Sequence, residues 1–397
     1  MRLCFYTGDP PLRDHAYGNH GVARHFINIL RDEDPVVLTQ LKRRSIQTEE
    51  IKDICGSLDL WLHPSVSALG LARFFPAVAA LLDALIFAAW LPFLSHRLSK
   101  AGIERIFILC GADALFLLHV WLIQKTGIPV DIYLVDDIKD SCERGVYRII
   151  KPWVAPFLRK VLENSARTFA ISPGFAGQNS IQIGVPTTWL PLPYPEFPEL
   201  SSEHVKLNGP NRHIVFIGAI NRLYVQSIRD LYDEICQYNA NENRDHKLIL
   251  EIITYGSTTP LFASLPNRDW VVGFEKLPDE ELQRHLAEAY TCFLPYSFSP
   301  EERLMVSTSF SCKILEYFQS RRPILVYGPD YASIPRYFKE LGLPLCATSR
   351  EELRKTLGQI AEHDSKELIE QYQSAWRCHH SPAAIRAILL SPARDAS

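Results

Sequence analysis

The chain has 397 residues, of which 47% are hydrophobic and 22% charged, and its formal net charge at pH 7 is −3. This length exceeds one ordinary domain, the composition is that of a globular protein, and the near-neutral charge gives no reason to expect a nucleic-acid partner. The nine cysteines are scattered without a C-x-x-C pair, so we expect no disulfide framework, no metal site and a cytoplasmic location.

Strand and helix patterns alternate through the first half of the chain. Short apolar runs end in turn residues and are followed by stretches with helical spacing. The expected strands lie at 3–6, 36–38, 106–110, 130–135 and 168–171. This alternation predicts a parallel sheet that is covered by helices on both faces.

Two segments of this half suggest contact with a membrane. Phe74 to Leu94 is apolar except for Asp83 and is long enough to cross a bilayer, but a charge near its centre is costly. We therefore favour a helix on the membrane surface, and a buried helix and a spanning helix stay open. Arg144 to Lys160 mixes basic and aromatic residues, which suits an anionic membrane surface or a solvated helix face.

A proline-rich stretch separates the two halves, and strand–helix alternation then restarts. The second set of expected strands lies at 213–217, 247–253, 270–272, 291–294 and 323–326. The sequence thus predicts a first lobe, a linker, a second lobe and a C-terminal tail that can cross back to the first lobe. Their predicted bounds are 1–185, 186–212, 213–375 and 376–397.

The segment from Ser307 to Val326 is expected to form a polar loop, a short helix and a buried strand. Lys313 and Glu316 stand three residues apart, so both project from one helix face. Free N–H groups at a helix N-terminus and an adjacent lysine suit a diphosphate, and a carboxylate one turn later suits ribose hydroxyls. The alternative is a solvated Lys–Glu pair on an ordinary amphipathic helix.

The run from Ser309 to Pro323 resembles the signature S-x-P-x-K-x-x-E-Y-x-x-x-x-x-P, with Ser311 at the first proline position. That signature is typical of family-4-like bacterial glycosyltransferases of the GT-B fold. The resemblance implies an α/β chain with two Rossmann-like parallel-sheet lobes that face a central cleft. It also implies a nucleoside-diphosphate sugar as donor, retention of configuration, and no metal or cofactor.

Further candidates for donor binding follow a strand of the second lobe. Gly218 ends that strand, and Asn221 and Arg222 lie on the next loop. The resemblance implies that Arg222 and Lys313 neutralise the leaving diphosphate in place of a metal ion. The pattern is kept incompletely, because residues 225–227 replace the Lys-Gly that relatives carry.

Hydroxyl and glycine residues complete the donor-site prediction. Thr308 stands where relatives often carry a second carboxylate, and Ser309 and Ser311 are expected to hold phosphates. Gly18 and Gly21 permit close backbone approach at the first strand–helix junction, or simply lead into the helix. Three residues after two other strands are candidates for the base pocket or the core: Tyr255, Gly256 and Phe274.

The acceptor needs a general base, which we expect in the first lobe. Asp136 and Asp137 end a strand, and only one of two adjacent side chains can point into a cleft. The other can cap the following turn. His20, beside the two glycines, is the alternative base.

Taken together, these features predict a hexosyltransferase of bacterial polysaccharide assembly. It would move a sugar from a nucleotide-sugar to a glycan or lipid-linked acceptor, and would associate peripherally with the inner membrane through its first lobe. Two alternatives stay open. One is a sugar-nucleotide 2-epimerase, and the other is a catalytically silent GT-B scaffold that acts as a binding subunit.

Overall fold

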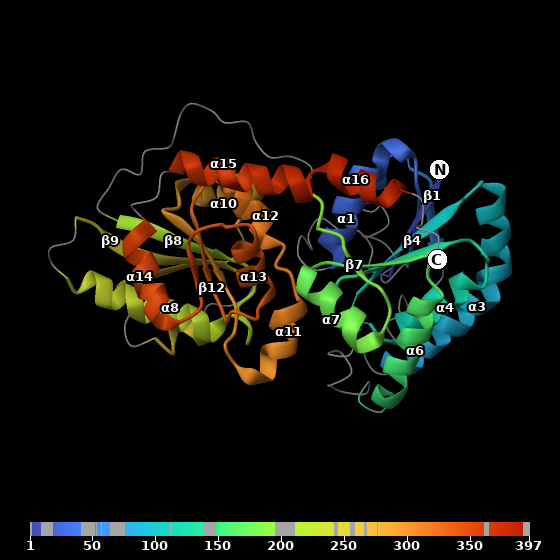
Figure 1. Cartoon of the computed structure of the whole chain (residues 1–397), viewed down its shortest axis with the longest axis horizontal. Coiled ribbons are helices and arrows are strands. Elements are labelled where there is room, and N and C mark those ends of the chain that lie inside the picture. The colour runs from blue at the N-terminus through green and yellow to red at the C-terminus, as the bar shows by residue number, and fades with distance from the viewer. Residues whose placement is uncertain are drawn as a thin grey trace. The chain divides into compact units, whose positions relative to one another are not determined.

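The computed structural model in Figure 1 describes residues 2–8, 19–40, 52, 54–56, 58–63, 76–111, 113–138, 148, 150–194, 211–241, 245–254, 259–265, 268–275, 277–360 and 365–391. The chain divides into two compact units. The first contains Met1–Pro195 and His379–Ser397, and the second contains Glu196–Cys378. Each unit is built around one parallel β-sheet, which confirms the prediction of two α/β sheets.

The sheet of the first unit has seven parallel strands in the order β3-β2-β1-β4-β5-β6-β7. Its central strands are buried along their whole length, as expected of a parallel sheet covered on both faces. The strands are β1 (Leu3–Thr7), β2 (Val36–Gln40), β3 (Leu60–His63), β4 (Arg105–Cys110), β5 (Val130–Leu134), β6 (Arg167–Ala170) and β7 (Thr188–Trp189).

The helices of the first unit are α1 (Asn19–Leu30), α3 (Pro76–Lys100), α4 (Phe116–Gln124), α6 (Lys151–Glu163), α7 (Pro173–Ile183) and α16 (Pro382–Leu390). Right-handed crossovers place α3, α4 and α6 on one face of the sheet and α1 on the other. Contacts between neighbouring helices agree with this arrangement, because α4 touches both α3 and α6, and α16 touches α1.

The first unit extends past the expected boundary at residue 185. Strand β7 adds to the sheet beside β6, and Leu190 and Leu192 after it are fully buried. The compact unit therefore continues to Pro195, and part of the proline-rich stretch belongs to its core.

Helix α3 contains most of the apolar segment in the sequence. In the described part of the chain it is the one helix whose length and composition would suffice to cross a membrane, criteria that a core helix also meets. It packs against α4, and Asp83 is 3% exposed on its inner side. The central charge of the segment is therefore directed into the protein.

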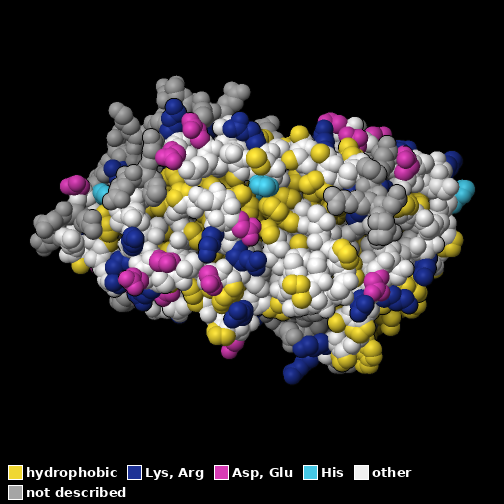
Figure 2. Space-filling view, viewed as in Figure 1, with side chains coloured by type: hydrophobic (Ala, Val, Ile, Leu, Met, Phe, Trp, Pro, Cys, Tyr) yellow, Lys and Arg dark blue, Asp and Glu magenta, His cyan; other side chains and the backbone are white. Residues whose placement is uncertain are grey.

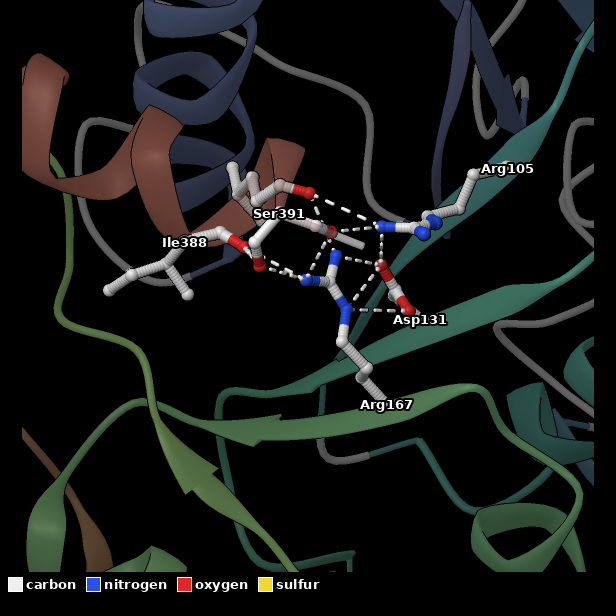
Figure 3. A network of polar contacts seen from close by, with 6 residues as sticks. Arg105, Asp131, Arg167, Ile388 and Ser391 are labelled. Carbon is white, nitrogen blue, oxygen red and sulfur yellow. Dashed lines mark hydrogen bonds and ion pairs between the residues drawn. The ribbon is translucent and has the colours of Figure 1, made fainter. Parts of the chain in front are cut away.

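The last helix of the chain, α16, packs in the first unit and ends at a polar network (Figure 3). Arg167 donates to the carbonyl oxygens of Ile388 and Leu389 at 2.8 Å each, and Arg105 donates to that of Ser391 at 2.9 Å. Asp131, which is 1% exposed, lies 2.5 Å from Arg167 Nη2 and 3.7 Å from Arg105 Nη1. Two cations thus satisfy the carbonyls that a helix C-terminus leaves without partners.

The second unit has six parallel strands in the order β10-β9-β8-β11-β12-β13. They are β8 (Asn211–Ile217), β9 (Lys247–Thr254), β10 (Val271–Glu275), β11 (Thr291–Pro295), β12 (Ile324–Tyr327) and β13 (Cys346–Ala347). The helices and turns around them are α8 (Val225–Asn239), α9 (Thr259–Phe262), α10 (Asp279–Glu288), η5 (Pro300–Glu302), α11 (Arg303–Thr308), α12 (Lys313–Ser320), α13 (Ser333–Glu340), α14 (Arg350–Gln359) and α15 (Ser365–Ala375). The π-helical turn Trp376–His380 then leads the chain to α16.

Candidate functional site

The carboxyl ends of β8 and β11 and the start of α12 meet in the second unit, at the edge where ligands bind in open α/β sheets. Gly218 follows β8 with φ of 109°, in the region that favours glycine. A Cβ atom at this position would lie 2.4 Å from Lys313 Cε and 3.0 Å from Lys313 Nζ. The absence of a side chain at Gly218 therefore makes room for Lys313.

The ammonium group of Lys313 is enclosed by aromatic rings. Nζ lies 4.0 Å from the ring centroid of Tyr224 and 5.0 Å from that of Phe216, and the residue is 6% exposed. Cation–π contacts favour the charge at this place. Among the residues that the structure describes, no carboxylate forms an ion pair with Lys313. A buried cation is costly unless an anion accompanies it, so this geometry suits an anionic ligand.

Tyr317 holds α12 in place. Its hydroxyl donates to the carbonyl oxygen of Phe293 on β11 and accepts from the N–H of Ile217 on β8, both at 3.1 Å. The ring is fully buried, which raises the pKa of this phenol well above its usual value. One buried side chain thus joins the helix to two neighbouring strands and fixes the direction in which Lys313 and Glu316 project.

The loop before α12 is held by Tyr296, which follows β11. The Tyr296 hydroxyl accepts from the backbone N–H of Ser311 at 3.1 Å, and Ser333 donates to the carbonyl oxygen of Ser309. The first contact gives a physical reason for the departure from the signature, because a proline at position 311 would have no N–H to donate. No side chain caps the helix N-terminus at Cys312.

Thr308 uses its hydroxyl for hydrogen bonds within its own helix. It ends α11 and is 2% exposed, and its Oγ1 donates back to the carbonyl oxygens of Leu304 and Met305 at 3.0 and 3.3 Å. Such back-bonding is a common way to satisfy a threonine in a helix. In this structure the Thr308 donor is therefore engaged within its own helix.

Arg222 lies at this edge of the sheet and pairs with a residue that the sequence had not indicated. Its Nε lies 2.8 Å from Oε1 of Glu302, whose side chain is 7% exposed, whereas the Arg222 side chain is 45% exposed. The sequence does contain a pattern that could have indicated Glu302. Glu301 and Glu302 follow Pro300 as an acidic pair at the start of a helix, shortly after a strand. Glu302 thus holds Arg222 by one edge and leaves the rest of its guanidinium accessible.

Asn221 organises the same loop. Its Oδ1 accepts from the N–H of Leu223 at 2.9 Å, and its carbonyl oxygen accepts from the N–H groups of Tyr224 and Val225 at 3.0 and 2.9 Å. This is the Asx-turn geometry that begins a helix. The predicted donor-binding residue Asn221 therefore sets the course of the loop that carries Arg222 and Tyr224.

Of the predicted donor residues of the second unit, the structure brings Gly218 against Lys313 and places Arg222 on the loop that follows Gly218. Glu316 is half-buried in the first turn of α12. Phe274 lies elsewhere, with its ring 4.8 Å from that of His285. Tyr255 and Gly256 lie outside the described residues.

The remaining candidates belong to the first unit. Asp136 and Asp137 follow β5 at the carboxyl edge of its sheet, where Asp136 is half-buried and Asp137 is 5% exposed. Gly21, expected in a loop, is instead buried in the first turn of α1, and His20 is the residue before it in the same helix. Gly18 lies outside the described residues.

Neither a protein-family model nor a curated protein sequence matches this chain. Solved structures do match. The lipopolysaccharide outer core galactosyltransferase WaaB in its apo form has a TM-score of 0.64 at 12% identity, with 98% of each chain covered. Anabaena Alr3699/HepE in complex with UDP and glucose has a TM-score of 0.62 at 13% identity, with 98% of each chain covered.

A third solved structure belongs to a different class of enzyme. The UDP-GlcNAc 2-epimerase from Neisseria meningitidis bound to UDP-GlcNAc has a TM-score of 0.55 at 10% identity, with 98% of each chain covered. Likeness at such low identity establishes architecture rather than activity. With two parallel sheets of seven and six strands and full-length agreement with these proteins, the chain has the GT-B fold of the glycosyltransferases.

Proposed function

We propose that this chain is a glycosyltransferase that moves a hexose from a nucleoside-diphosphate sugar to a hydroxyl of a glycan or lipid-linked acceptor in bacterial polysaccharide assembly. The observation that carries the proposal is Lys313, a buried ammonium without a described carboxylate partner, at the carboxyl edge of the sheet. A diphosphate would supply the missing negative charge, and the N-terminus of α12 would add its own positive field.

The chemistry follows from this placement. The bond between the anomeric carbon and the donor phosphate oxygen breaks, a bond to the acceptor oxygen forms, and the acceptor proton passes to a base or to the departing phosphate. Negative charge accumulates on the leaving diphosphate, and fixed cations stabilise it most in a poorly solvated site. Lys313 and Arg222 would provide that charge without a metal ion, and Glu316 would bind hydroxyls of the ribose or sugar.

The acceptor side of the proposal rests on the first unit. Asp136, Asp137 or His20 would assist the acceptor hydroxyl, and all three stand at or next to the carboxyl edge of that sheet. Retention of configuration is proposed from the resemblance of the Ser309–Pro323 run alone. We place the enzyme in the cytoplasm, associated peripherally with the inner membrane.

Two alternatives are kept because specific observations favour them. The GT-B architecture is shared with a UDP-GlcNAc 2-epimerase that binds its sugar nucleotide, and such an enzyme would also need a diphosphate site. A silent scaffold is favoured by the departures at Ser311 and Thr308 from the expected pattern. Incubation of the protein with a sugar nucleotide but no acceptor distinguishes the epimerase from the scaffold and from the transferase. Only an epimerase would change the configuration of the sugar, and NMR detects that change.

The donor site is tested by measuring the binding of UDP-, GDP-, ADP-, dTDP- and CMP-sugars by thermal shift and calorimetry. UDP-sugars come first, because HepE was solved with UDP and glucose. Lys313→Met keeps the apolar stem against Gly218 and the aromatic rings but removes the charge. We expect one nucleotide to raise the melting temperature of the wild type, and Lys313→Met to weaken its binding at least tenfold.

The matched control is Lys355→Met, an exposed lysine on α14 of the same unit, which should bind the nucleotide as the wild type does. Binding that is equal in all three proteins would remove Lys313 from the site. No binding of any nucleotide by the folded wild type would favour the silent scaffold.

A further inference from the structure

Helix α3 presents two different faces. Its inner face packs into the first unit, where the Phe87 ring lies 4.6 Å from that of His119 and 6.0 Å from that of Tyr6. Asp83, one turn earlier on this face, is 3% exposed. The outer face is apolar and open to solvent, with Val78 56%, Leu81 54%, Leu82 38%, Leu85 59% and Phe93 54% exposed.

The outer residues follow the helical repeat and lie along one side of α3, called here the α3 stripe: Val78, Leu81, Leu82, Leu85 and Phe93. From Val78 to Phe93 the stripe extends over about 23 Å, at a rise of about 1.5 Å per residue. Within these bounds the helix carries one charged residue, Asp83, and it is on the other face. An exposed apolar surface that extends this far indicates contact with another protein or with a membrane.

Basic residues lie on the helix that carries the α3 stripe and on the helices of the same layer. The helices α3, α4 and α6 with the residue that caps α4 carry six cations, Arg97, Lys100, Lys125, Lys151, Arg159 and Lys160, against two anions, Asp83 and Glu163. One of these anions is buried and the other pairs with Arg159 at 2.7 Å. The whole chain carries a net charge of −3, so these helices are more basic than the chain as a whole.

An exposed tryptophan lies on α6, in the same layer of helices. Trp153, in the first turn of α6, is 66% exposed between Lys151 and the exposed Pro156. Figure 2 shows hydrophobic side chains gathered at the lower right, where α6 lies in Figure 1, with Lys and Arg beside them. Tryptophan favours the boundary between lipid headgroups and acyl chains, because its ring is apolar and its N–H is polar.

The positive charge distinguishes between two partners that could cover this surface, a second copy of the chain and a membrane. A second copy of the chain in a two-fold contact would place the basic residues of one copy near those of the other. An anionic bilayer surface instead complements them and accepts the apolar stripe. A span across the bilayer does not fit α3, because one of its faces packs on α4 and holds Asp83.

We propose that the α3 stripe and Trp153 insert into the headgroup region of an anionic membrane, while the lysines and arginines of α3 and α6 contact lipid phosphates. This deepens the proposed membrane association by naming its surface and its lipid chemistry. It rests on that part of the proposed function and not on the donor site. An acceptor attached to a lipid would then meet the enzyme at the bilayer surface.

The experiment is co-sedimentation of the full-length protein with vesicles, without donor or acceptor. Vesicles of phosphatidylcholine alone are compared with vesicles that contain about 30% phosphatidylglycerol. We expect at least tenfold tighter binding to the anionic vesicles, and a loss of at least tenfold in Leu81→Glu/Leu85→Glu. Raising the salt concentration should weaken binding of the wild type, because it screens the basic residues.

Two controls address folding and charge. Val272→Glu on the exposed strand β10 of the second unit introduces the same acidic residue at a partly exposed apolar site and should keep vesicle binding. Lys151→Glu should weaken binding several-fold, whereas Lys355→Glu on α14 should change it less. The circular dichroism and nucleotide-induced thermal shift of the Leu81/Leu85 variant should match the wild type.

Failure to bind either kind of vesicle, or equal losses in the stripe variant and in Val272→Glu, would overturn the proposal. A concentration-dependent dimer in light scattering that Leu85→Glu abolishes would assign the stripe to a second copy. Either result leaves the nucleotide panel on Lys313 unaffected, so this inference and the donor-site proposal fail separately.

Discussion

The side chain of Lys313 lies directly over the backbone of Gly218, so that a single methyl group at position 218 would come within 2.4 Å of Lys313 Cε. This contact joins the end of β8 to the start of α12. It also directs the ammonium toward Tyr224, whose ring centroid is 4.0 Å away. The position of the cation is therefore set by the absence of a side chain on one residue and by aromatic rings on others.

Gly218→Ala tests this contact. We expect the variant to displace Lys313 and to weaken nucleotide binding about tenfold or more, which is about 1.4 kcal/mol. Its free energy of unfolding should fall by about 1–3 kcal/mol, because the residue has φ of 109° and its neighbour is close. Nucleotide titration calorimetry and urea unfolding measure the two effects.

Gly342→Ala is the control for backbone strain. Gly342 lies in the same unit with φ of 64° and has nothing within 4 Å of the added methyl group. It should lose stability through strain and bind nucleotide normally. If both variants bind normally, the Gly218–Lys313 contact has no part in donor binding.

Glu302→Gln tests whether Glu302 positions Arg222. The neutral amide keeps the shape of the side chain but loses the ion pair at 2.8 Å, so Arg222 should become less ordered. Because Arg222 is partly exposed, we expect a moderate loss of about 3–10-fold in nucleotide affinity. Binding isotherms of Glu302→Gln, Arg222→Gln and the double variant measure it.

The double variant should lose no more affinity than Arg222→Gln alone, since Glu302 acts through Arg222. Glu301→Gln, the exposed neighbour, serves as the control for charge and should match the wild type. Additive losses in the double variant would mean that Glu302 acts on the ligand in another way.

Arg167→Met tests the network at the end of α16. The substitution removes the cation beside Asp131, which is 1% exposed, and several hydrogen bonds to the last carbonyls of the helix. Asp131 keeps only the longer pair with Arg105 at 3.7 Å, and the last carbonyls of the helix lose Arg167 as a donor, so the free energy of unfolding should fall by about 2–4 kcal/mol. Urea unfolding checks the value, and faster proteolysis near residue 390 would show that the helix is released.

Arg159→Met removes an exposed arginine of α6 from its pair with Glu163 and should change stability by about 0.5 kcal/mol or less. If Arg167→Met behaves like Arg159→Met, the network does not hold α16.

The buried histidines predict the acid sensitivity of the first unit. Burial lowers the pKa of His119 to about 3, with His63 adding to the shift and Asp83 opposing it, and burial lowers the pKa of His380 to about 4. A group whose pKa is lower in the folded state binds protons mainly when unfolded. The free energy of unfolding is therefore highest above about pH 6.5, the ordinary pKa of histidine. It decreases as the pH falls toward the pKa values that these histidines have in the folded protein.

Each of these histidines should lower the free energy of unfolding by up to about 1.4 kcal/mol per pH unit in that interval. His119→Gln keeps a polar group near the Tyr6 hydroxyl, which lies 2.9 Å from His119 Nδ1, and removes the titration. Urea unfolding at pH 7, 6 and 5 should show a smaller decrease for this variant than for the wild type. An identical slope in the two proteins would mean that His119 already binds its proton in the folded state.

Much of the site could be predicted because its parts are local in sequence. The placing of Lys313 and Glu316 on one helix face follows from the helical period of 3.6 residues, and the position of Gly218 follows from the apolar run that ends there. The role of Tyr317 could not be predicted in this way. Its hydroxyl connects β8 to β11 through two backbone groups, and this requires strands that are distant in sequence to be neighbours in the sheet.

The sequence by itself determined the two α/β sheets, the helix that carries Lys313 and Glu316, and the apolar character of α3, because each depends on neighbouring residues of one element. The tertiary structure alone decided that Glu302 pairs with Arg222, that Asp83 lies on the inner face of α3, and that α16 ends against Arg105 and Arg167. These are contacts between residues far apart in the chain. They form because packing of whole elements brings the side chains together, and local sequence patterns do not contain that information.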